Sequence, residues 1–272
     1  SYEGAEAFTL TASALGKTGS DSSTILDDGT GQVHDDEGAA DSTATADDDR
    51  PVFSISPVTV SEGGKAFFTV TRTGASDVAQ TVKVSTSIET GDTAEAGDFT
   101  SVTNQTLSFA AGVTTQTFFV QTGADTTYEG LETFTVTLSD ATGGAQISTT
   151  AGTAQGTIAD DGTGTVFNEN GTVDSEATAD DDRSLTVSGL DAVSEGSNAV
   201  FTVSLGGNPS GAEVTLGLGA SGDTAASGDY AALSGASAYY FAGGAKTALA
   251  ITDGKVNLPG GVTSLFVGVP DA

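Results

Sequence analysis

Residues 132–138 read ETFTVTL, and this stretch decides the fold. Its apolar residues Phe134, Val136 and Leu138 fall on every second position, and threonines occupy the positions between them. A period of two in Val, Phe and Thr is typical of a strand with one buried face. The stretch therefore predicts a β-strand, not a helix.

The same alternation recurs at residues 8–11, 58–60 and 68–70. The segments between such runs are rich in Gly, Asp, Ser and Ala, which suit turns. No window of a dozen residues carries a convincing helical period. Many short strands at close spacing predict an all-β protein of tandem antiparallel β-sandwiches with an immunoglobulin-like architecture.

An internal repeat indicates that the sandwiches are tandem copies of one module. Self-similarity this dense is the signature of repeated structural units. A shorter motif, YEG, occurs at residues 2–4 and again at 128–130. Three longer motifs recur 133 residues apart: TI-x-DDGTG at 24–31 and 157–164, ADDDR at 46–50 and 179–183, and VSEG at 60–63 and 193–196.

The phase of the repeat predicts one complete module and one module split between the two ends of the chain. Residues 51–161 form the complete module. Residues 1–28 read as the last strands of a module, and residues 184–272 as a module that stops before those strands. The segments 29–50 and 162–183 are predicted to be acidic linkers.

Three arrangements agree with this phase. The chain is a window of a continuous array, an arbitrary fragment, or a subunit that joins its neighbours head to tail. In the last case residues 1–28 of one copy complete residues 184–272 of the next by strand complementation. Because the chain starts at Ser1 and holds no Met, we expect a processed subunit, a cloned window or one unit of something longer.

The charge balance excludes several classes of function. The chain has 37 acidic against 8 basic residues, a formal net charge of −29. Nucleic-acid binding requires a basic face, and insertion into a membrane requires an apolar run of about 20 residues, so neither is expected. A chain this rich in carboxylates is expected to fold better when a cation neutralises it, and calcium is the obvious candidate.

Catalytic arrangements are not indicated either. The absence of Cys excludes thiolate zinc sites and cysteine nucleophiles. His34 is the only histidine and lies in a predicted linker, so a Ser-His-Asp triad has no support. The absence of Trp argues against an aromatic sugar cleft. We therefore expect a protein that is not an enzyme.

Four motifs in order make the chain resemble the Calx-β family, the calcium-binding sandwich of sodium–calcium exchanger regulatory loops and of giant bacterial surface proteins. They are VSEG at 60–63, GDF at 97–99, YEGLETF at 128–134 and GTIADD at 156–161. The resemblance implies Ca²⁺ bound by a cluster of carboxylates at one end of each sandwich. Carboxylates from separate loops can supply the six to eight oxygen ligands that calcium takes.

The resemblance implies a ligand set for each module, although solvated turn residues are the alternative interpretation. The family pattern has more acidic residues where Thr126 and Thr127 stand here, and its closing triplet is one carboxylate longer, which predicts fewer sites or weaker binding. The implied ligands of the complete module are Glu62, Asp98, Asp125, Glu129, Glu132, Asp160 and Asp161. Those of the split module are Glu195, Asp229 and Asp271, with Glu3, Glu6, Asp27 and Asp28 from the following copy.

Both linkers end in Asp-Asp-Asp-Arg. A calcium ion that stiffens each junction and a flexible acidic linker are both compatible with this composition. The candidate linker ligands are Asp47, Asp48, Asp49, Asp180, Asp181 and Asp182.

The split module contains extra residues near 245–260, which predict either an added hairpin for a specific contact or ordinary loop variation. The expected function is a calcium-stiffened structural repeat of a secreted or cell-surface bacterial fibre or adhesin. Its expected partners are neighbouring copies of the same repeat, and the adhesion target is left open. The alternative is a calcium-sensing module that regulates a partner protein.

Overall fold

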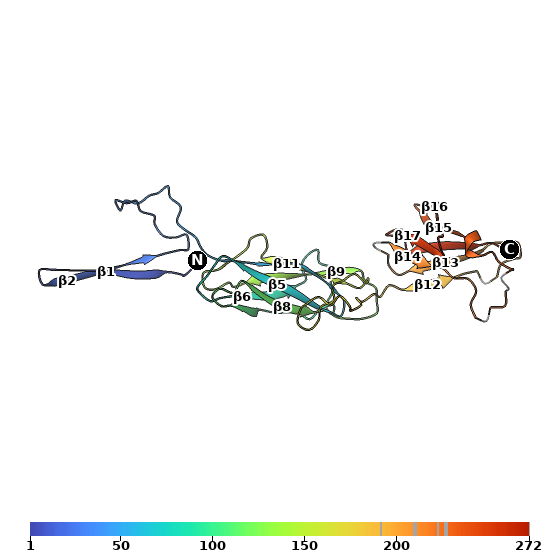
Figure 1. Cartoon of the computed structure of the whole chain (residues 1–272), viewed down its shortest axis with the longest axis horizontal. Helices are drawn as coiled ribbons and strands as arrows, with labels where there is room; N and C mark the ends of the chain where they lie inside the picture. Colours follow the sequence, from blue (N-terminus) through green and yellow to red (C-terminus); the bar gives the residue numbers. More distant parts are fainter. Residues whose placement is uncertain (191, 209–210, 222, 226–227, 272) are drawn as a thin grey trace. The chain divides into compact units, whose positions relative to one another are not determined.

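The computed structural model describes residues 1–190, 192–208, 211–221, 223–225 and 228–271. It consists of strands and loops, with a single short 3₁₀ helix, η1 (Leu233–Gly235), among the described residues (Figure 1). The all-β prediction is confirmed. The chain divides into two units, which are described in turn. The first comprises residues 1–125, 131–159 and 163–179, and the second comprises residues 126–130, 160–162 and 180–272.

The first unit contains two facing sheets that enclose one hydrophobic core. All strand pairs are antiparallel except β10 with β3 and β11 with β4, which are parallel. One sheet has the order β10 (Gln146–Ile147), β3 (Val52–Ile55), β5 (Lys65–Thr73), β8 (Thr115–Gln121). The other has the order β4 (Val58–Ser61), β11 (Thr153–Ala159), β9 (Leu131–Ser139), β6 (Gln80–Ser87), β7 (Gln105–Phe109).

The alternation in β9 positions the centre of this core. Phe134, Val136 and Leu138 are all buried, as the period of two predicts. The Phe134 ring stacks on Phe99 with centroids 4.4 Å apart. Gly156 on the adjacent strand lies under the ring, and a Cβ there would come within 2.3 Å of it. A glycine at this position therefore makes room for the largest side chain of the strand.

Part of the predicted linker 162–183 packs against the first unit. Ser61 donates its N–H to the Thr165 carbonyl at 3.0 Å, and the Phe167 ring lies 5.6 Å from the Phe67 ring. Lys65 forms an ion pair with Glu169. Apolar and ionic contacts thus hold residues of this segment on β4 and β5.

The first unit also contains a hairpin that forms a sheet of its own, made of β1 (Glu6–Ala14) and β2 (Lys17–Ile25). The register is continuous from Glu6 opposite Ile25 to Ala14 opposite Lys17. Every residue of both strands is exposed. The hairpin is thus a two-stranded ribbon with no burial on either face.

The second unit contains a five-stranded and a two-stranded sheet around a smaller core. All of its strand pairs are antiparallel. The larger sheet has the order β12 (Leu185–Ser188), β13 (Ala199–Leu205), β18 (Ser264–Val269), β15 (Ser237–Ala242), β16 (Ala245–Leu249). The smaller consists of β14 (Ala212–Thr215) and β17 (Lys255–Leu258).

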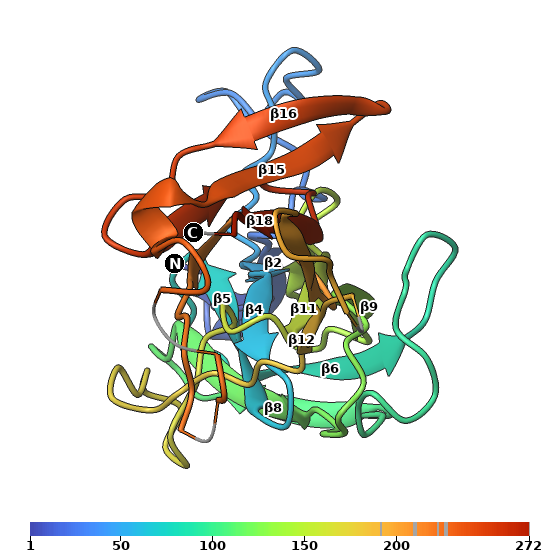
Figure 2. The ribbon, with the colours of Figure 1, turned by 90° about the vertical axis from the view of Figure 1, so that its right-hand side faces the viewer.

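The extra hairpin of this unit differs from the one expected near 245–260. Residues 245–249 form β16 and pair with β15, whereas residues 255–258 form β17 and pair with β14. Figure 2 shows β16 at the outer edge of the larger sheet, with β15 between it and β18. The difference has a packing reason, because Val256 and Leu258 are buried in the core and Lys246 instead lies over the exposed edge, 3.7 Å from the Tyr239 ring centroid.

Replacing Phe134 by alanine is expected to lower the free energy of unfolding by about 3–5 kcal/mol, because the ring is fully buried and its loss leaves a cavity. Urea unfolding followed by circular dichroism measures the change. Leu131→Ala is the matched control on the same strand. Its side chain is exposed, so its cost should stay within about 0.5 kcal/mol. Equal costs for the two variants would contradict this assignment of the core.

Candidate metal centre

Three loops meet at one end of the complete module, where backbone hydrogen bonds tie them together. The Gly63 N–H donates to the Gly123 carbonyl at 2.6 Å, and the Gly123 N–H donates to the Asp98 carbonyl at 2.7 Å. Gly123 must be a glycine, because a Cβ there would lie 2.6 Å from the Gly97 oxygen. The loops that carry the predicted ligands therefore start from fixed backbone positions.

Glu62 and Asp125 come from two of these loops and form the first carboxylate pair. Glu62 directly follows β4, and its Oε1 accepts a hydrogen bond from the Asp125 N–H at 2.9 Å. Carboxylate oxygens of the two residues lie within 4.8 Å of one another. Two oxygens bound to one calcium ion at about 2.4 Å each can be separated by at most about 4.8 Å, so this pair can share one ion.

Asp98 and Glu132 form the second pair, and their oxygens also lie within 4.8 Å of one another. Core packing fixes the backbone beside both residues. Asp98 directly precedes Phe99, Glu132 lies two residues before Phe134, and the two phenylalanine rings stack on each other. Glu129 is a further predicted ligand three positions before Glu132. Like charges this close disfavour each other in their ionised forms, and a bound cation would offset the repulsion.

Asp160 is buried, and its carboxylate accepts backbone hydrogen bonds. Its Oδ2 accepts the Glu129 N–H at 2.6 Å, and its Oδ1 accepts the Gly130 N–H at 3.2 Å. Gly130 has a φ of +88°, a conformation that favours glycine. The sequence predicted Asp160 as a metal ligand. In the structure it fixes the backbone of the loop that carries Glu129.

Asp161, also buried, pairs with Asp181 of the predicted linker in an isolated antiparallel bridge. The bridge is extended by the Asp182 N–H, which donates to the Asp160 carbonyl at 2.9 Å. Arg183 binds Asp181 through two side-chain hydrogen bonds of 2.7 Å, and these bonds lower the pKa of that carboxyl. The Asp-Asp-Asp-Arg motif thus folds back on the turn at residues 160–162, which belongs to the same unit.

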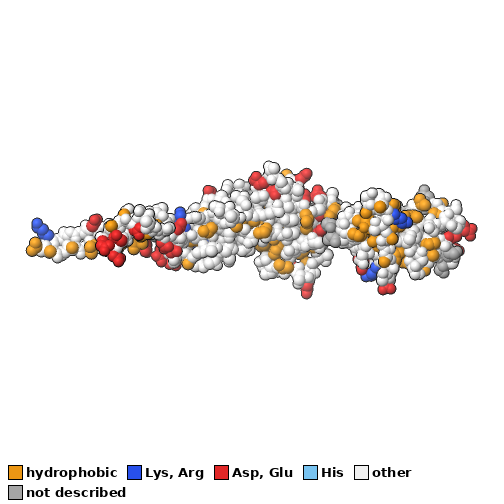
Figure 3. Space-filling model, turned by 90° about the horizontal axis from the view of Figure 1, so that it is seen from above, with side chains coloured by type: hydrophobic (Ala, Val, Ile, Leu, Met, Phe, Trp, Pro, Cys, Tyr) orange, Lys and Arg blue, Asp and Glu red, His pale blue; other side chains and the backbone are white. Residues whose placement is uncertain are grey.

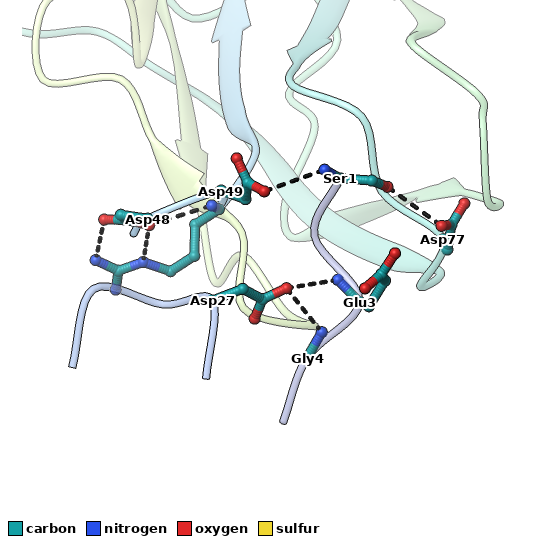
Figure 4. Close-up of polar contacts among 8 residues, drawn as sticks. Ser1, Glu3, Gly4, Asp27, Asp48, Asp49 and Asp77 are labelled. Atoms are coloured by element: carbon teal, nitrogen blue, oxygen red, sulfur yellow. Dashed lines mark hydrogen bonds and ion pairs between the residues drawn. The ribbon is translucent and has the colours of Figure 1, made fainter. Parts of the chain in front are cut away.

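The same arrangement occurs a second time near the N-terminus (Figure 4). Asp27 Oδ2 accepts the Glu3 N–H at 2.7 Å and the Gly4 N–H at 3.3 Å. Gly4 has the same φ of +88° as Gly130. The Asp49 N–H donates to the Asp27 carbonyl at 2.9 Å, as Asp182 does to Asp160. Repeated sequence has therefore produced repeated geometry.

The arginine of the motif also repeats its contact. Arg50 binds Asp48 through two side-chain hydrogen bonds of 2.8 and 2.7 Å, which lower the pKa of Asp48 from 3.8 to about 2. The neighbouring carbonyl of Asp47 accepts the Gly29 N–H at 2.8 Å. Asp28 accepts hydrogen bonds from the Thr30 side chain and backbone, which lower its pKa. Sequence analysis missed the role of the arginine, although its recurrence in ADDDR was the available signal.

The residues before Glu3 dock on the complete module. The Ser1 amino group donates to Asp49 at 3.1 Å, which raises the pKa of the amine, and the Ser1 hydroxyl donates to Asp77 at 3.2 Å. Tyr2 is almost fully buried, and it exchanges backbone hydrogen bonds with Ala75 and Asp77. These contacts anchor the base of the β1–β2 hairpin.

The predicted ligands of the split module are placed less closely together. Asp271 Oδ2 accepts the Gly196 N–H at 2.7 Å, next to Glu195. Asp229 and Asp271 line the same cavity of the second unit. Within the described part of the chain, no group of three or more carboxylates with mutual oxygen distances within 4.8 Å includes Glu195, Asp229 or Asp271. Glu3 and Glu6, predicted to complete this set from another copy, are exposed in the first unit.

The electrostatic setting favours a cation over an anion. The face drawn in Figure 3 carries more acidic than basic side chains, in keeping with the net charge of −29. The oxygen-only donor sets of the two carboxylate pairs suit a hard divalent ion such as Ca²⁺, which takes carboxylate, carbonyl and water oxygens. The residues that could hold it are Glu62 and Asp125, and Asp98 and Glu132.

Comparison with known proteins gives one matching family model and several solved structures that align with part of the chain. The family model of the Calx-beta domain matches residues 46–162 of this chain. An apo-form Calx CBD1 domain is 25% identical, with 41% of this chain and 98% of that chain covered and a TM-score of 0.38. The calcium binding domain CBD12 of CALX1.1 is 20% identical, with 82% and 75% covered and a TM-score of 0.39.

A two-domain protein of unknown function from Bacteroides fragilis NCTC 9343 is 10% identical, with 82% of this chain and 89% of that chain covered and a TM-score of 0.32. No curated protein matches the chain. In the described ranges, no helix has the length and apolar character needed to cross a membrane.

The Asp48 carboxyl is expected to titrate with a midpoint near 2, well below its ordinary 3.8. Because the folded pKa is lowered, the Asp48–Arg50 contact stabilises the fold above about pH 4 and loses that effect as the pH falls through about 2. Carboxyl carbon shifts measured by nuclear magnetic resonance give the midpoint. In the Arg50→Gln variant the midpoint should return toward 3.8, and an unchanged midpoint would refute the assigned cause.

Asp160→Ala removes the acceptor of the Glu129 and Gly130 amides and is expected to lower the free energy of unfolding by about 1–3 kcal/mol. Asp160→Asn keeps one side-chain oxygen in place and should cost less. Urea unfolding of the two variants without added metal provides the comparison. Equal losses would mean that the carboxylate does not act through these backbone contacts.

Proposed function

Residues 46–162 of this chain match the family model of the Calx-beta domain, and from this match we propose that the protein is a calcium-binding structural repeat of a secreted or cell-surface fibre or adhesin. Calx-beta domains are a family of calcium-binding domains. In this proposal Ca²⁺ occupies the carboxylate pairs at the loop end of the complete module and stiffens it. Neighbouring copies of the repeat are joined head to tail.

The observation that carries the calcium part is the spacing of the carboxylate pairs. Glu62 with Asp125, and Asp98 with Glu132, each present oxygens within 4.8 Å of one another. Glu132 lies on β9, and the other three lie on loops that hydrogen bonds join. A site whose loops are fixed in advance loses little conformational entropy when the ion binds. In return, the ion removes the repulsion within each pair and ties the loops to one another.

The structural part is supported by the repeated junction. Asp27 and Asp160 hold the same two amides of the two YEG motifs, and both ADDDR motifs fold back on the DDG turns. A junction built twice from the same contacts suits an element that keeps successive modules in order. Protein modules outside the cell typically bind Ca²⁺ with dissociation constants of about 10⁻⁴–10⁻³ M, which matches a stiffening role in a calcium-rich medium.

Calcium is expected to raise the melting temperature of the chain, and EDTA to reverse the rise. With dissociation constants of about 10⁻⁴–10⁻³ M, about 10 mM calcium stabilises the folded module by about 1.4–2.7 kcal/mol. Differential scanning calorimetry measures the shift, and isothermal titration calorimetry gives the affinity. A melt that does not respond to calcium would refute the calcium part of the proposal.

The double variant Asp98→Asn, Glu132→Gln is expected to lose most of this calcium-dependent shift while it folds without the metal, since it removes charge and keeps side-chain shape. Asp140→Asn is the matched control. Asp140 is an exposed carboxylate of the same module, paired with Lys83 at 2.8 Å and outside the predicted ligand set. It should leave the calcium response unchanged.

A further inference from the structure

The β1–β2 hairpin exposes an apolar face. Phe8 and Leu10 alternate with threonines on β1 and are 55% and 72% exposed, and Ile25 at the end of β2 is 56% exposed. A two-stranded hairpin alone is at best marginally stable in water, because it cannot bury an apolar face. On β1 this face therefore carries apolar side chains that are not buried, and Ser23 and Asp21 of β2 stand opposite Phe8 and Leu10 on it.

The complete module shows what the same sequence does when it is covered. The YEG motif at 2–4 precedes Phe8 by the same spacing that separates 128–130 from Phe134, and TI at 24–25 corresponds to TI at 157–158. The hairpin is thus the counterpart of β9 and β11. There Phe134 and Ile158 are buried, at 0% and 2% exposure.

Among the described residues of the second unit, no strands correspond to this pair. In the complete module, β9 pairs with β6, and β11 pairs with β9 and β4. In the second unit the corresponding sheet consists of β14 and β17, and β14 pairs with β17 on one edge only within the described residues. Its other edge is in the position where β6 receives β9.

An apolar cavity of about 710 Å³ lies in the second unit, and it is lined by side chains from both sheets. Val203, Val214 and Val267 contribute to its walls. Leu185 and Val187 also line it and are each 63% exposed. Groups that form the inside of a sandwich in the complete module are thus open to solvent here.

We propose that this cavity is the docking groove for the β1–β2 hairpin of a second copy of the chain. β1 adds to the free edge of β14 as β9 adds to β6, and Phe8, Leu10 and Ile25 enter the cavity. The inference deepens the head-to-tail assembly proposed above and rests on it, although it does not depend on calcium. Strand addition pairs the unpaired backbone N–H and C=O groups at the edge of β14. At the same time the apolar side chains of the hairpin leave water and fill the cavity.

The test uses two variants that each disable one partner surface. Leu10→Asp places a charge on the hairpin face, and Val187→Asp places one on the groove wall. Both positions are exposed, so neither change should prevent folding. By light scattering after size exclusion, the unmodified chain is expected to form species several times the mass of the 26.7 kDa monomer, and each variant alone to stay at 26.7 kDa.

An equimolar mixture of the two variants distinguishes docking from general loss of association. Leu10→Asp keeps an intact groove and Val187→Asp keeps an intact hairpin, so the mixture should give a species of twice the monomer mass and nothing larger. The matched controls are Thr11→Asp and Thr186→Asp, which add the same charge one residue away on the opposite faces of β1 and β12. They should assemble like the unmodified chain.

Three results would overturn the docking proposal: a monomeric unmodified chain, a mixture that stays monomeric, or controls that lose assembly as the variants do. The calcium response of the complete module is measured on the same samples and tests the proposed function separately. If Leu10→Asp remains monomeric but keeps its calcium-dependent melting shift, assembly and calcium binding are independent. If assembly persists without any calcium response, only the calcium part fails.

Discussion

Repulsion among carboxylates is the constraint on which the rest of this structure depends. A chain with 37 acidic and 8 basic residues must hold its loops together against its own charge. It does so in two ways that the structure shows directly. Backbone amides converge on Asp27 and Asp160, and an arginine forms a two-bond contact with Asp48 and with Asp181. A cation bound between the carboxylate pairs is the third way under the proposed function.

These ways act at different positions for a physical reason. Asp160 is almost fully buried, where an ionised group needs several hydrogen bonds, and amides of the adjacent loop provide them. Asp98, on a loop, and Glu132, on β9, present carboxylate oxygens within 4.8 Å of one another. Asp160 thus organises the backbone, and the pair of Asp98 and Glu132 is a candidate to bind an ion.

The second organising feature is the distribution of apolar surface. The complete module buries its alternating residues between two sheets. The second unit and the β1–β2 hairpin each carry half of such an arrangement, one as an open cavity and the other as an exposed face. The repeat explains why the two halves match, because they derive from strands that are neighbours in the complete module.

The sequence by itself determined the strands, the repeat and the resemblance of residues 46–162 to the Calx-beta domain. Alternation in ETFTVTL requires one buried face, and motifs 133 residues apart require equivalent modules, so local pattern was enough. The family resemblance also named the carboxylates at the loop end as candidate ligands, and their role in metal binding stays a prediction. The sequence misplaced the extra hairpin, because alternation cannot say which partner a strand takes, and the burial of Val256 and Leu258 decides that β17 pairs with β14.

Tertiary structure alone decided which carboxylates share space and which bind the backbone. Asp160 and Asp98 look alike in the sequence, but Asp160 accepts the Glu129 and Gly130 amides, whereas Asp98 accepts the Glu95 amide and also lies beside Glu132. The contact of the arginine in ADDDR is local, because it binds the aspartate two residues before it, whereas the pairing of ADDDR with the DDG turn was decided by the tertiary structure. The physical reason is that ligand sets and ion pairs depend on distances of a few ångströms, which residue order does not encode directly.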